Sequence, residues 1–260
     1  MQQHFNVASA KRLTLRVPPL LEQQAVAGVL GALDDKITGN ERVARAAENL
    51  CRAVFSDNSW EARTTVGEIA ALHKGQVRPE TLTDGSVAHY SLPAFDSGAV
   101  PEIADPRTIK SAKFIVRQPS ILLSKLNPEI PRVWNVSPDR TMPALASTEF
   151  LVLEPQSGVT TAELWAVLSQ PEFLGGLAAK VTGTSKSHQR VRPAEVMNSA
   201  VVDPRELGHA RRQAQALVSR AMQARSESRR LAALRDTLLP HLMSGKLRVR
   251  EAEKIVEDAV

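Results

Sequence analysis

The feature that most constrains the fold is a run of apolar or small residues spaced alternately four and three apart, from Val26 to Val54. This spacing is typical of a coiled-coil seam, in which a lone polar residue such as Asn40 fixes register and partner number. A core helix of a globular domain is the alternative. A helix of ~36 residues would be ~54 Å long, which favours the coiled coil. The predicted seam is Val26, Leu30, Leu33, Ile37, Asn40, Ala44, Ala47, Cys51 and Val54.

A second long segment, between Pro204 and Pro240, repeats this spacing with smaller side chains. Proline is tolerated in the first turn of a helix, so Pro18-Pro19 and Pro204 are predicted to open the two helices. The small seam residues indicate a closely packed partner helix. Most of the arginines on this segment are expected to face solvent. The second predicted seam is Ala210, Ala214, Leu217, Ala221, Ala224, Ser228 and Leu231.

The chain between the two segments has short apolar runs broken by Gly, Pro, Asn and Asp, which indicates a mixed α/β domain. Residues 113–126 and 149–155 are predicted to form strands, and residues 161–181 are predicted to be helical with an interruption at Pro171. We therefore predict an α+β protein, in which one mixed α/β domain is flanked by two long coiled-coil helices.

Residues 5–19 and 190–204 share a pattern at an offset of 185: a polar segment, an apolar run, then a proline before a long helix. We interpret residues 1–18 as the tail of a preceding domain copy. The first helix is then residues 19–56, and the complete domain is residues 57–205. The second helix and a C-terminal tail occupy residues 206–260.

Composition limits the possible functions. The single cysteine, Cys51, rules out an internal disulfide and suits a reducing cytosol. We find neither a signal peptide nor an apolar run long enough for a membrane span, so a cytoplasmic protein is expected. The net charge of +5 suggests an anionic partner. Basic residues cluster in residues 107–140 and 180–192. Ordinary surface charge is the alternative explanation for both clusters.

The sequence offers no recognisable catalytic site. We find no glycine-rich cofactor fingerprint, no pair of histidines at metal-ligand spacing, and no credible nucleophile–base pair. Aromatic residues make up only 4% of the chain, which argues against binding single strands by base stacking. We therefore expect a protein without catalytic activity, metal or cofactor.

Several stretches give the chain a resemblance to the specificity subunits of type I restriction–modification systems. They are "LRVPPLLEQQAVAGVLGALDDKI", "ILLSKLNPEIPRVW", "ASTEFLVLEP", "GTSKSHQRVRPAEVMNSAVV" and "LRDTLLPHLMSGKLRV". The resemblance implies antiparallel helices that hold two target-recognition domains apart, each domain reading half of a split double-stranded DNA site. It also implies a non-catalytic subunit that binds methyltransferase subunits and, through them, the restriction subunit.

The chain departs from this family pattern because it has only one recognition domain. It is either a natural half-subunit or a fragment. A half-subunit is expected to form a homodimer or to pair with another specificity half-subunit. A homodimer would present two identical domains and would read a symmetric, interrupted site.

Specific DNA binding needs phosphate contacts for affinity and base-edge contacts for information. The strongest candidate is the segment 182–192, which combines glycine, hydroxyl and basic side chains; a plain polar turn is the alternative. Two further polar turns, at 72–80 and 124–132, are weaker candidates. The predicted DNA-binding residues are Lys74, Gln76, Arg78, Lys125, Asn127, Arg132, Thr184, Ser185, Lys186, Ser187, His188, Gln189 and Arg190.

Two other functions remain open at this stage. The chain could be a scaffold or modulator that pairs with a full specificity subunit without binding DNA, although the polar and basic 182–192 segment disfavours this. It could also be an enzyme with an unfamiliar site, which the missing cofactor motif disfavours.

Overall fold

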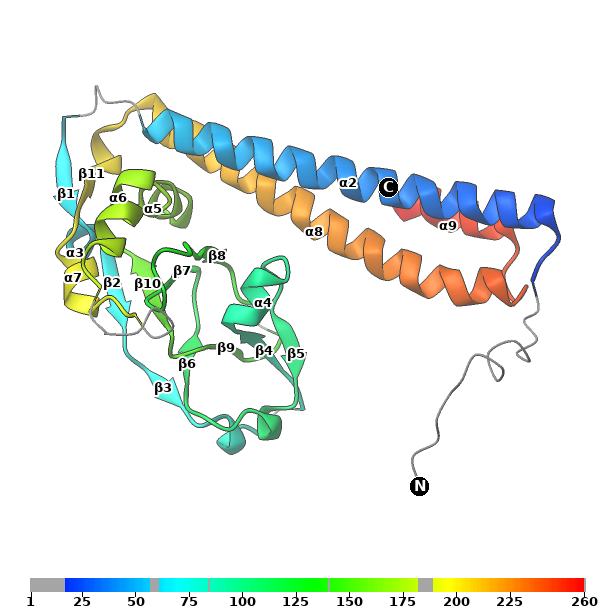
Figure 1. The fold of residues 1–260 in the computed structure, drawn as a ribbon, viewed down its shortest axis with the longest axis horizontal. Coiled ribbons are helices and arrows are strands. Elements are labelled where there is room, and N and C mark those ends of the chain that lie inside the picture. Colours follow the sequence, from blue (N-terminus) through cyan, green and yellow to red (C-terminus); the bar gives the residue numbers. More distant parts are fainter. Residues whose placement is uncertain (1–16, 57–60, 84, 140, 182–188, 260) are drawn as a thin grey trace. The chain divides into compact units, whose positions relative to one another are not determined.

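The computed structural model describes residues 17–56, 61–83, 85–139, 141–181 and 189–259 (Figure 1). Most of the predicted tail at residues 1–18 therefore lies outside the described residues. The chain divides into two compact units, Met1–Ala46 with Arg220–Val260 and Ala47–Ser219.

The secondary structure mixes helices and short strands. The α-helices are α2 (Leu20–Phe55), α3 (Val66–Ile69), α4 (Leu92–Asp96), α5 (Thr161–Leu168), α6 (Pro171–Ala178), α7 (Pro193–Met197), α8 (His209–Met243) and α9 (Val249–Ala259). The strands are β1 (Arg63–Thr65), β2 (Ala70–His73), β3 (Gln76–Val77), β4 (Val87–Tyr90), β5 (Glu102–Ala104), β6 (Lys113–Val116), β7 (Ser120–Ser124), β8 (Val133–Val136), β9 (Ala144–Ala146), β10 (Phe150–Pro155) and β11 (Ala200–Val202). Short 3-10 helices are η1 (Pro79–Thr81), η2 (Pro106–Thr108) and η4 (Pro204–Glu206).

In the first unit, α2 and α8 run antiparallel, because residues later in α2 contact residues earlier in α8. Arg235 donates to Asp34 at 2.6 Å, and Lys36 lies 3.5 Å from Glu227. Helix α9 packs against α2 and α8 (Figure 1), and its Ala252 is fully buried in the apolar cluster that α2 and α8 form. Helix α9 is absent from the prediction, which treated these residues as a tail.

Side-chain burial follows the predicted spacing with two differences. Val29, which the prediction omitted, is buried on α2, and on α8 Val218 is buried whereas its neighbour Leu217 is half-buried. The buried members of the predicted seams are Val26, Leu33, Asn40, Ala44, Ala47, Cys51, Ala210, Ala214, Ala221, Ala224, Ser228 and Leu231. The half-buried ones are Leu30, Ile37, Val54 and Leu217.

The helix ends show where local signals succeed and fail. Helix α2 begins at Leu20, directly after Pro18-Pro19, which confirms that prediction. The prediction that Pro204 opens the second helix was wrong, because η4 forms there and α8 begins only at His209. The Asp203 carboxylate caps η4 by accepting from Arg205 N, and Gly208 then adopts a φ of +50°, which a helix cannot contain.

The described strands of the second unit form two larger sheets and a two-stranded one. The strand orders are β2-β10-β7-β8, β3-β6-β9-β4-β5 and β1-β11. All the pairings are antiparallel except that between β4 and β9. Strands β6, β7 and β10 occupy the predicted runs, and the predicted helical segment is divided into α5 and α6 at Pro171. These observations confirm a mixed α/β domain with two long helices.

The four-stranded sheet is buried on both faces, which explains its unbroken apolar sequence. Ile121 and Leu123 of β7 belong to the same apolar cluster as Leu164 of α5. Leu122, between them, points to the other face, where it clusters with Trp134 and residues of the five-stranded sheet. The apolar run predicted as a strand therefore lies between two layers of side chains.

Candidate DNA interface

The second unit brings the described parts of the three predicted DNA-binding segments together, the third of them from residue 189 onward. The main-chain N–H of Asn127 donates to the Gln189 carbonyl at 2.8 Å, and that of Val191 donates to the Lys125 carbonyl at 3.0 Å. Lys74, Gln76 and Lys125 line one hollow of about 460 Å³, together with residues of α7. The turn after β2, the turn after β7 and the chain after residue 188 therefore form one continuous face.

The turn between β2 and β3 presents polar side chains to solvent. Lys74, Gln76 and Arg78 are all exposed, so their charges and donors are accessible. The glycine among them has a packing reason, because a Cβ at Gly75 would lie 2.7 Å from Nε2 of His73. His73 is held on its other side by Glu154, 3.1 Å from Nδ1. The imidazole ring therefore occupies the space that a side chain at position 75 would need.

Asn127 shapes the turn after β7. Its φ is +47°, in the left-handed region where asparagine is tolerated better than most residues. Its side-chain Oδ1 is buried and has no hydrogen-bond partner among the described residues. The backbone of this turn is bonded on both sides, since Ile130 N donates to the Asn127 carbonyl. The observed role of Asn127 is to form the turn, and its contact with DNA stays a prediction.

Two of the predicted arginines already hold carboxylates. Arg132 donates to Asp96 from Nε and Nη2 at 2.7 and 2.8 Å, and Arg190 donates to Glu149 through two bonds of 3.0 Å. These hydrogen bonds lower the pKa of both Asp96 and Glu149 below the usual carboxyl range. In the structure these arginines tie loops together, which the sequence could not indicate because the partners lie far away along the chain.

Two basic residues of the stretch 107–140 also have polar partners. Arg107 donates to Asp105, and Lys113 is buried with its Nζ bonded to the carbonyl and hydroxyl of Ser111. The predicted DNA-binding residues Lys74, Arg78 and Lys125 remain exposed or half-buried. Five predicted DNA-binding residues lie outside the described residues: Thr184, Ser185, Lys186, Ser187 and His188.

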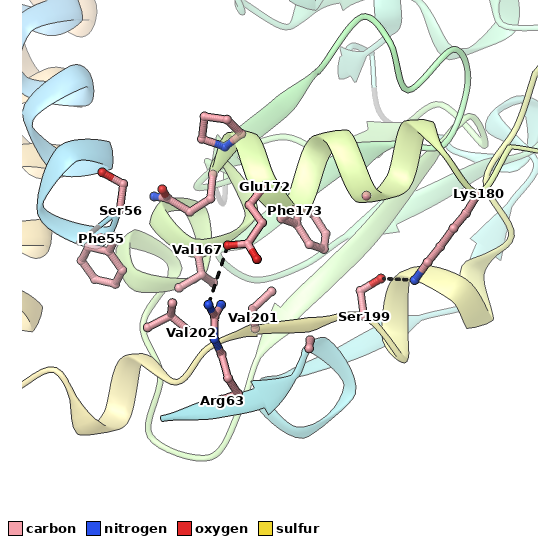
Figure 2. Close-up of a pocket in the computed structure, with 14 residues that line it drawn as sticks. Phe55, Ser56, Arg63, Val167, Glu172, Phe173, Lys180, Ser199, Val201 and Val202 are labelled. Atoms are coloured by element: carbon pink, nitrogen blue, oxygen red, sulfur yellow. Dashed lines mark hydrogen bonds and ion pairs between the residues drawn. The ribbon is translucent and has the colours of Figure 1, made fainter. Parts of the chain in front are cut away.

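A second hollow, of about 480 Å³, lies elsewhere in the second unit and has a different chemistry. Figure 2 shows it between the end of α2, helix α6 and strand β11. Arg63 lies 3.7 Å from Glu172 across it, and Lys180 donates to the Ser199 hydroxyl at 3.3 Å. Because its basic groups already have polar partners, it is a poorer site for a phosphate backbone than the face formed by Lys74 and Lys125.

Two searches of the described part of the chain bear on other classes of function. Among those residues no group of three or more His, Cys, Asp or Glu side chains is placed to hold a metal ion. No helix within the described ranges is long and apolar enough to cross a membrane.

Comparison with known proteins identifies the fold. No protein-family model and no curated protein matches the chain. Among solved structures it is similar to the type I restriction–modification S subunit from M. genitalium, with a TM-score of 0.55 and 17% identity, over 86% of this chain. The HsdS subunit from Thermoanaerobacter tengcongensis gives a TM-score of 0.41 at 16% identity, over 90% of this chain. The chain spans 61% of the length of each. The chain therefore has the fold of a type I restriction–modification S subunit.

Proposed function

We propose that the chain is a non-catalytic DNA-recognition subunit of a type I restriction–modification complex. In this role it directs methyltransferase subunits, and through them the restriction subunit, to a bipartite site in double-stranded DNA. The observation that carries the proposal is that the two polar turns and the chain from Gln189 onward converge on one face, in a domain with the fold of an S subunit.

The chemistry of this face suits DNA. Lys74, Arg78 and Lys125 supply positive charge for phosphates, a contribution that does not depend on sequence. Gln76 has an amide that can bond the edge of an adenine through one donor and one acceptor. Its exposed position at the start of β3, beside Lys74, suits a base contact flanked by phosphate contacts.

A split site needs two recognition domains. We assign the recognition domain to residues 57–205, and we propose that a second copy of this chain, or another specificity half-subunit, supplies the other. The antiparallel helices would then separate the two reading faces. A homodimer would read a two-fold symmetric site with an interruption.

The test is a gel shift of the chain with its methyltransferase subunits on a pool of random duplexes, followed by sequencing of the bound DNA. Lys74→Ala and Lys125→Ala should each weaken binding across all sequences and reduce the slope of log affinity against log salt by about one. Lys246→Ala is the control, since Lys246 is an exposed lysine of the first unit. Gln76→Ala should instead relax the preference at one position of the site.

Failure of this test would favour the other candidate. If the chain binds the methyltransferase subunits but no duplex is retained, it is a scaffold or modulator that pairs with a full specificity subunit. The ion pairs that already occupy Arg132 and Arg190 are the observation that keeps this second function in consideration.

A further inference from the structure

Helix α5 and the residues that follow it contact the last turn of α2. The Gln170 side chain is buried and its Nε2 donates to the Arg52 carbonyl at 3.2 Å and to the Ala166 carbonyl at 2.9 Å. The Arg52 guanidinium lies 5.1 Å from the centre of the Trp165 ring, in cation–π range. Trp165 is itself fixed to the sheet, because its Nε1 donates to the Val133 carbonyl.

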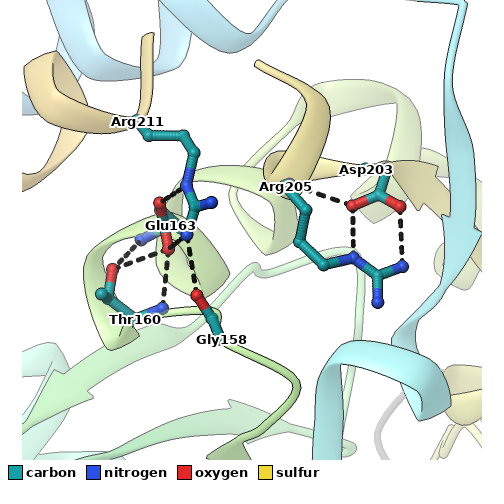
Figure 3. A network of polar contacts seen from close by, with 6 residues as sticks. All are labelled: Gly158, Thr160, Glu163, Asp203, Arg205 and Arg211. Carbon is teal, nitrogen blue, oxygen red and sulfur yellow. Dashed lines mark hydrogen bonds and ion pairs between the residues drawn. The ribbon is translucent and has the colours of Figure 1, made fainter. Parts of the chain in front are cut away.

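The other end of α5 contacts the first turn of α8 through a buried carboxylate. Figure 3 shows Glu163 between Thr160 and Arg211, and only 2% of Glu163 is exposed. Glu163 accepts from Thr160 N at 2.7 Å, as the N3 residue of a capping box, and from Arg211 Nε. Arg211 also donates to the Gly158 carbonyl at 2.7 Å, so it bonds both the helix and the loop before it.

Apolar contacts join the same elements, but they do not explain the ion pair. Cys51 and Phe55 of α2, Ala210 and Ala214 of α8, and Leu164 of α5 share one buried cluster. Glu163 is buried and Arg211 is half-buried, and replacing a buried ion pair by apolar residues of similar volume is often neutral or stabilising. The ion pair does restrict geometry, because a planar guanidinium group and a carboxylate form two hydrogen bonds in only a few relative orientations. The Glu163–Arg211 pair therefore fixes the orientation of α5 relative to the first turn of α8, which apolar packing alone leaves open.

We propose that α5 is the positioning element that holds the recognition domain to the ends of both long helices, with Glu163 and Arg211 fixing its direction, and that it thereby sets the spacer between the halves of the DNA site. This inference rests on the proposed function. Each base pair of spacer adds about 3.4 Å and about a tenth of a turn between half-sites. A domain free to tilt at the end of a helix ~54 Å long would accept more than one spacer.

The experiment uses the chain with its methyltransferase subunits and a duplex library with random half-sites and random spacer lengths. The variants are Glu163→Gln, which removes the charge but keeps the shape, and Arg211→Lys, which keeps a cation beside Glu163 but loses the fork. Arg107→Lys is the matched control, since Arg107 forms an exposed pair with Asp105 at a distance from both long helices in sequence. Thermal melting establishes that each variant is folded.

The wild type and Arg107→Lys should select one spacer length. Glu163→Gln and Arg211→Lys should select the same half-site bases with a spacer distribution broadened or shifted by about one base pair, which corresponds to a tenth of a turn. A purely structural role would lower affinity without moving the spacer. If folded Arg211→Lys keeps the wild-type spacer, the inference is overturned and the proposed function stands. If the wild type selects no site, or one half-site without a second at any spacing, both are overturned.

Discussion

The two units bury their interiors in different ways. In the first, the middle of the contact between α2 and α8 is lined by small and polar residues, among them Asn40, Ala221 and Ser228. In the second, Trp134, Phe150 and other large side chains fill both faces of the four-stranded sheet. Small side chains line the interior of the first unit and large ones fill that of the second, so the same type of substitution should act differently in each.

Their buried polar groups differ as well. The Asn40 Nδ2 is buried and has no hydrogen-bond partner among the described residues. Glu163, by contrast, accepts bonds from Thr160 and Arg211. A bonded buried group specifies geometry within its own unit, whereas an unbonded donor costs stability unless another molecule supplies an acceptor. That Asn40 fixes register and partner number stays a prediction.

The largest expected effect is loss of volume in the second unit. Phe150→Ala should lower the free energy of unfolding by ~3–5 kcal/mol, because Phe150 is fully buried with its ring centre 6.3 Å from that of Trp134. The free energy of unfolding can be measured by labelling Cys51, the lone cysteine, at increasing denaturant concentrations. Burial raises the pKa of the Cys51 thiol to about 12, so the thiol reacts only when this unit unfolds. Phe95→Ala, at the half-buried edge of the cluster, should lose less; an equal loss would contradict the volume argument.

The next effect is overpacking in the first unit. Ala221→Leu should destabilise by ~1–3 kcal/mol, because Ala221 is a small buried residue and a leucine at its place would overpack the interior. Thermal melting by circular dichroism at 222 nm measures the change. Ala233→Leu, an exposed alanine on the same helix, is the control and should be nearly neutral. Equal behaviour of the two variants would show that the seam has room for larger side chains.

A smaller effect of opposite sign is expected at Asn40. Asn40→Leu should raise the free energy of unfolding by about 1 kcal/mol, because it removes a buried donor that has no acceptor. The variant should also lose a unique partner number, which light scattering would detect as mixed oligomers. A destabilised variant would contradict this, because it would mean that the amide is bonded in the native assembly.

Local signals explain how much of the fold the sequence predicted. The spacing around Val26 and Leu33 needs only neighbouring residues, so α2 could be placed to within a residue or two of its ends. Helix α9 was missed although Ala252 and Val256 follow the same helical spacing. The start of α8 was missed because Asp203 caps a short turn before Gly208, and proline alone does not distinguish a 3-10 turn from a helix.

The candidate interface was predictable only in part. Polar turns rich in lysine and glutamine stand out in sequence, and Lys74, Gln76 and Lys125 do line one hollow. Which charges are already paired depends on contacts between distant residues, such as Arg132 with Asp96 and Arg190 with Glu149. The start of α5 has a local sequence signal, because Thr160 and Glu163 have the spacing of a capping box. No local signal marks Arg211 as the partner of Glu163, because the two residues lie far apart along the chain.

The last and smallest effect concerns acid. Among the described residues, the carboxylates whose pKa is lowered by hydrogen bonds lie in the second unit: Glu68, Asp96, Asp105, Asp139, Glu149 and Asp203. A carboxylate with a lowered folded-state pKa contributes stability that is complete above its unfolded pKa and is lost as pH falls through its folded pKa. Acid should therefore weaken the second unit, which tryptophan fluorescence reports because Trp134 and Trp165 lie there.

Arg190→Gln isolates one of these pairs. The variant removes the hydrogen bonds that lower the pKa of Glu149, so its stability should fall less steeply below pH 4.5, the ordinary value for glutamate. A partly exposed ion pair is worth ~0.2–1 kcal/mol, so the difference at neutral pH should be no larger. Arg192→Gln, an exposed arginine nearby, should keep the wild-type acid dependence. Identical acid profiles for the wild type and Arg190→Gln would mean that Arg190 faces solvent in solution instead of binding Glu149. The Arg190 guanidinium would then be accessible to DNA, as the sequence predicts.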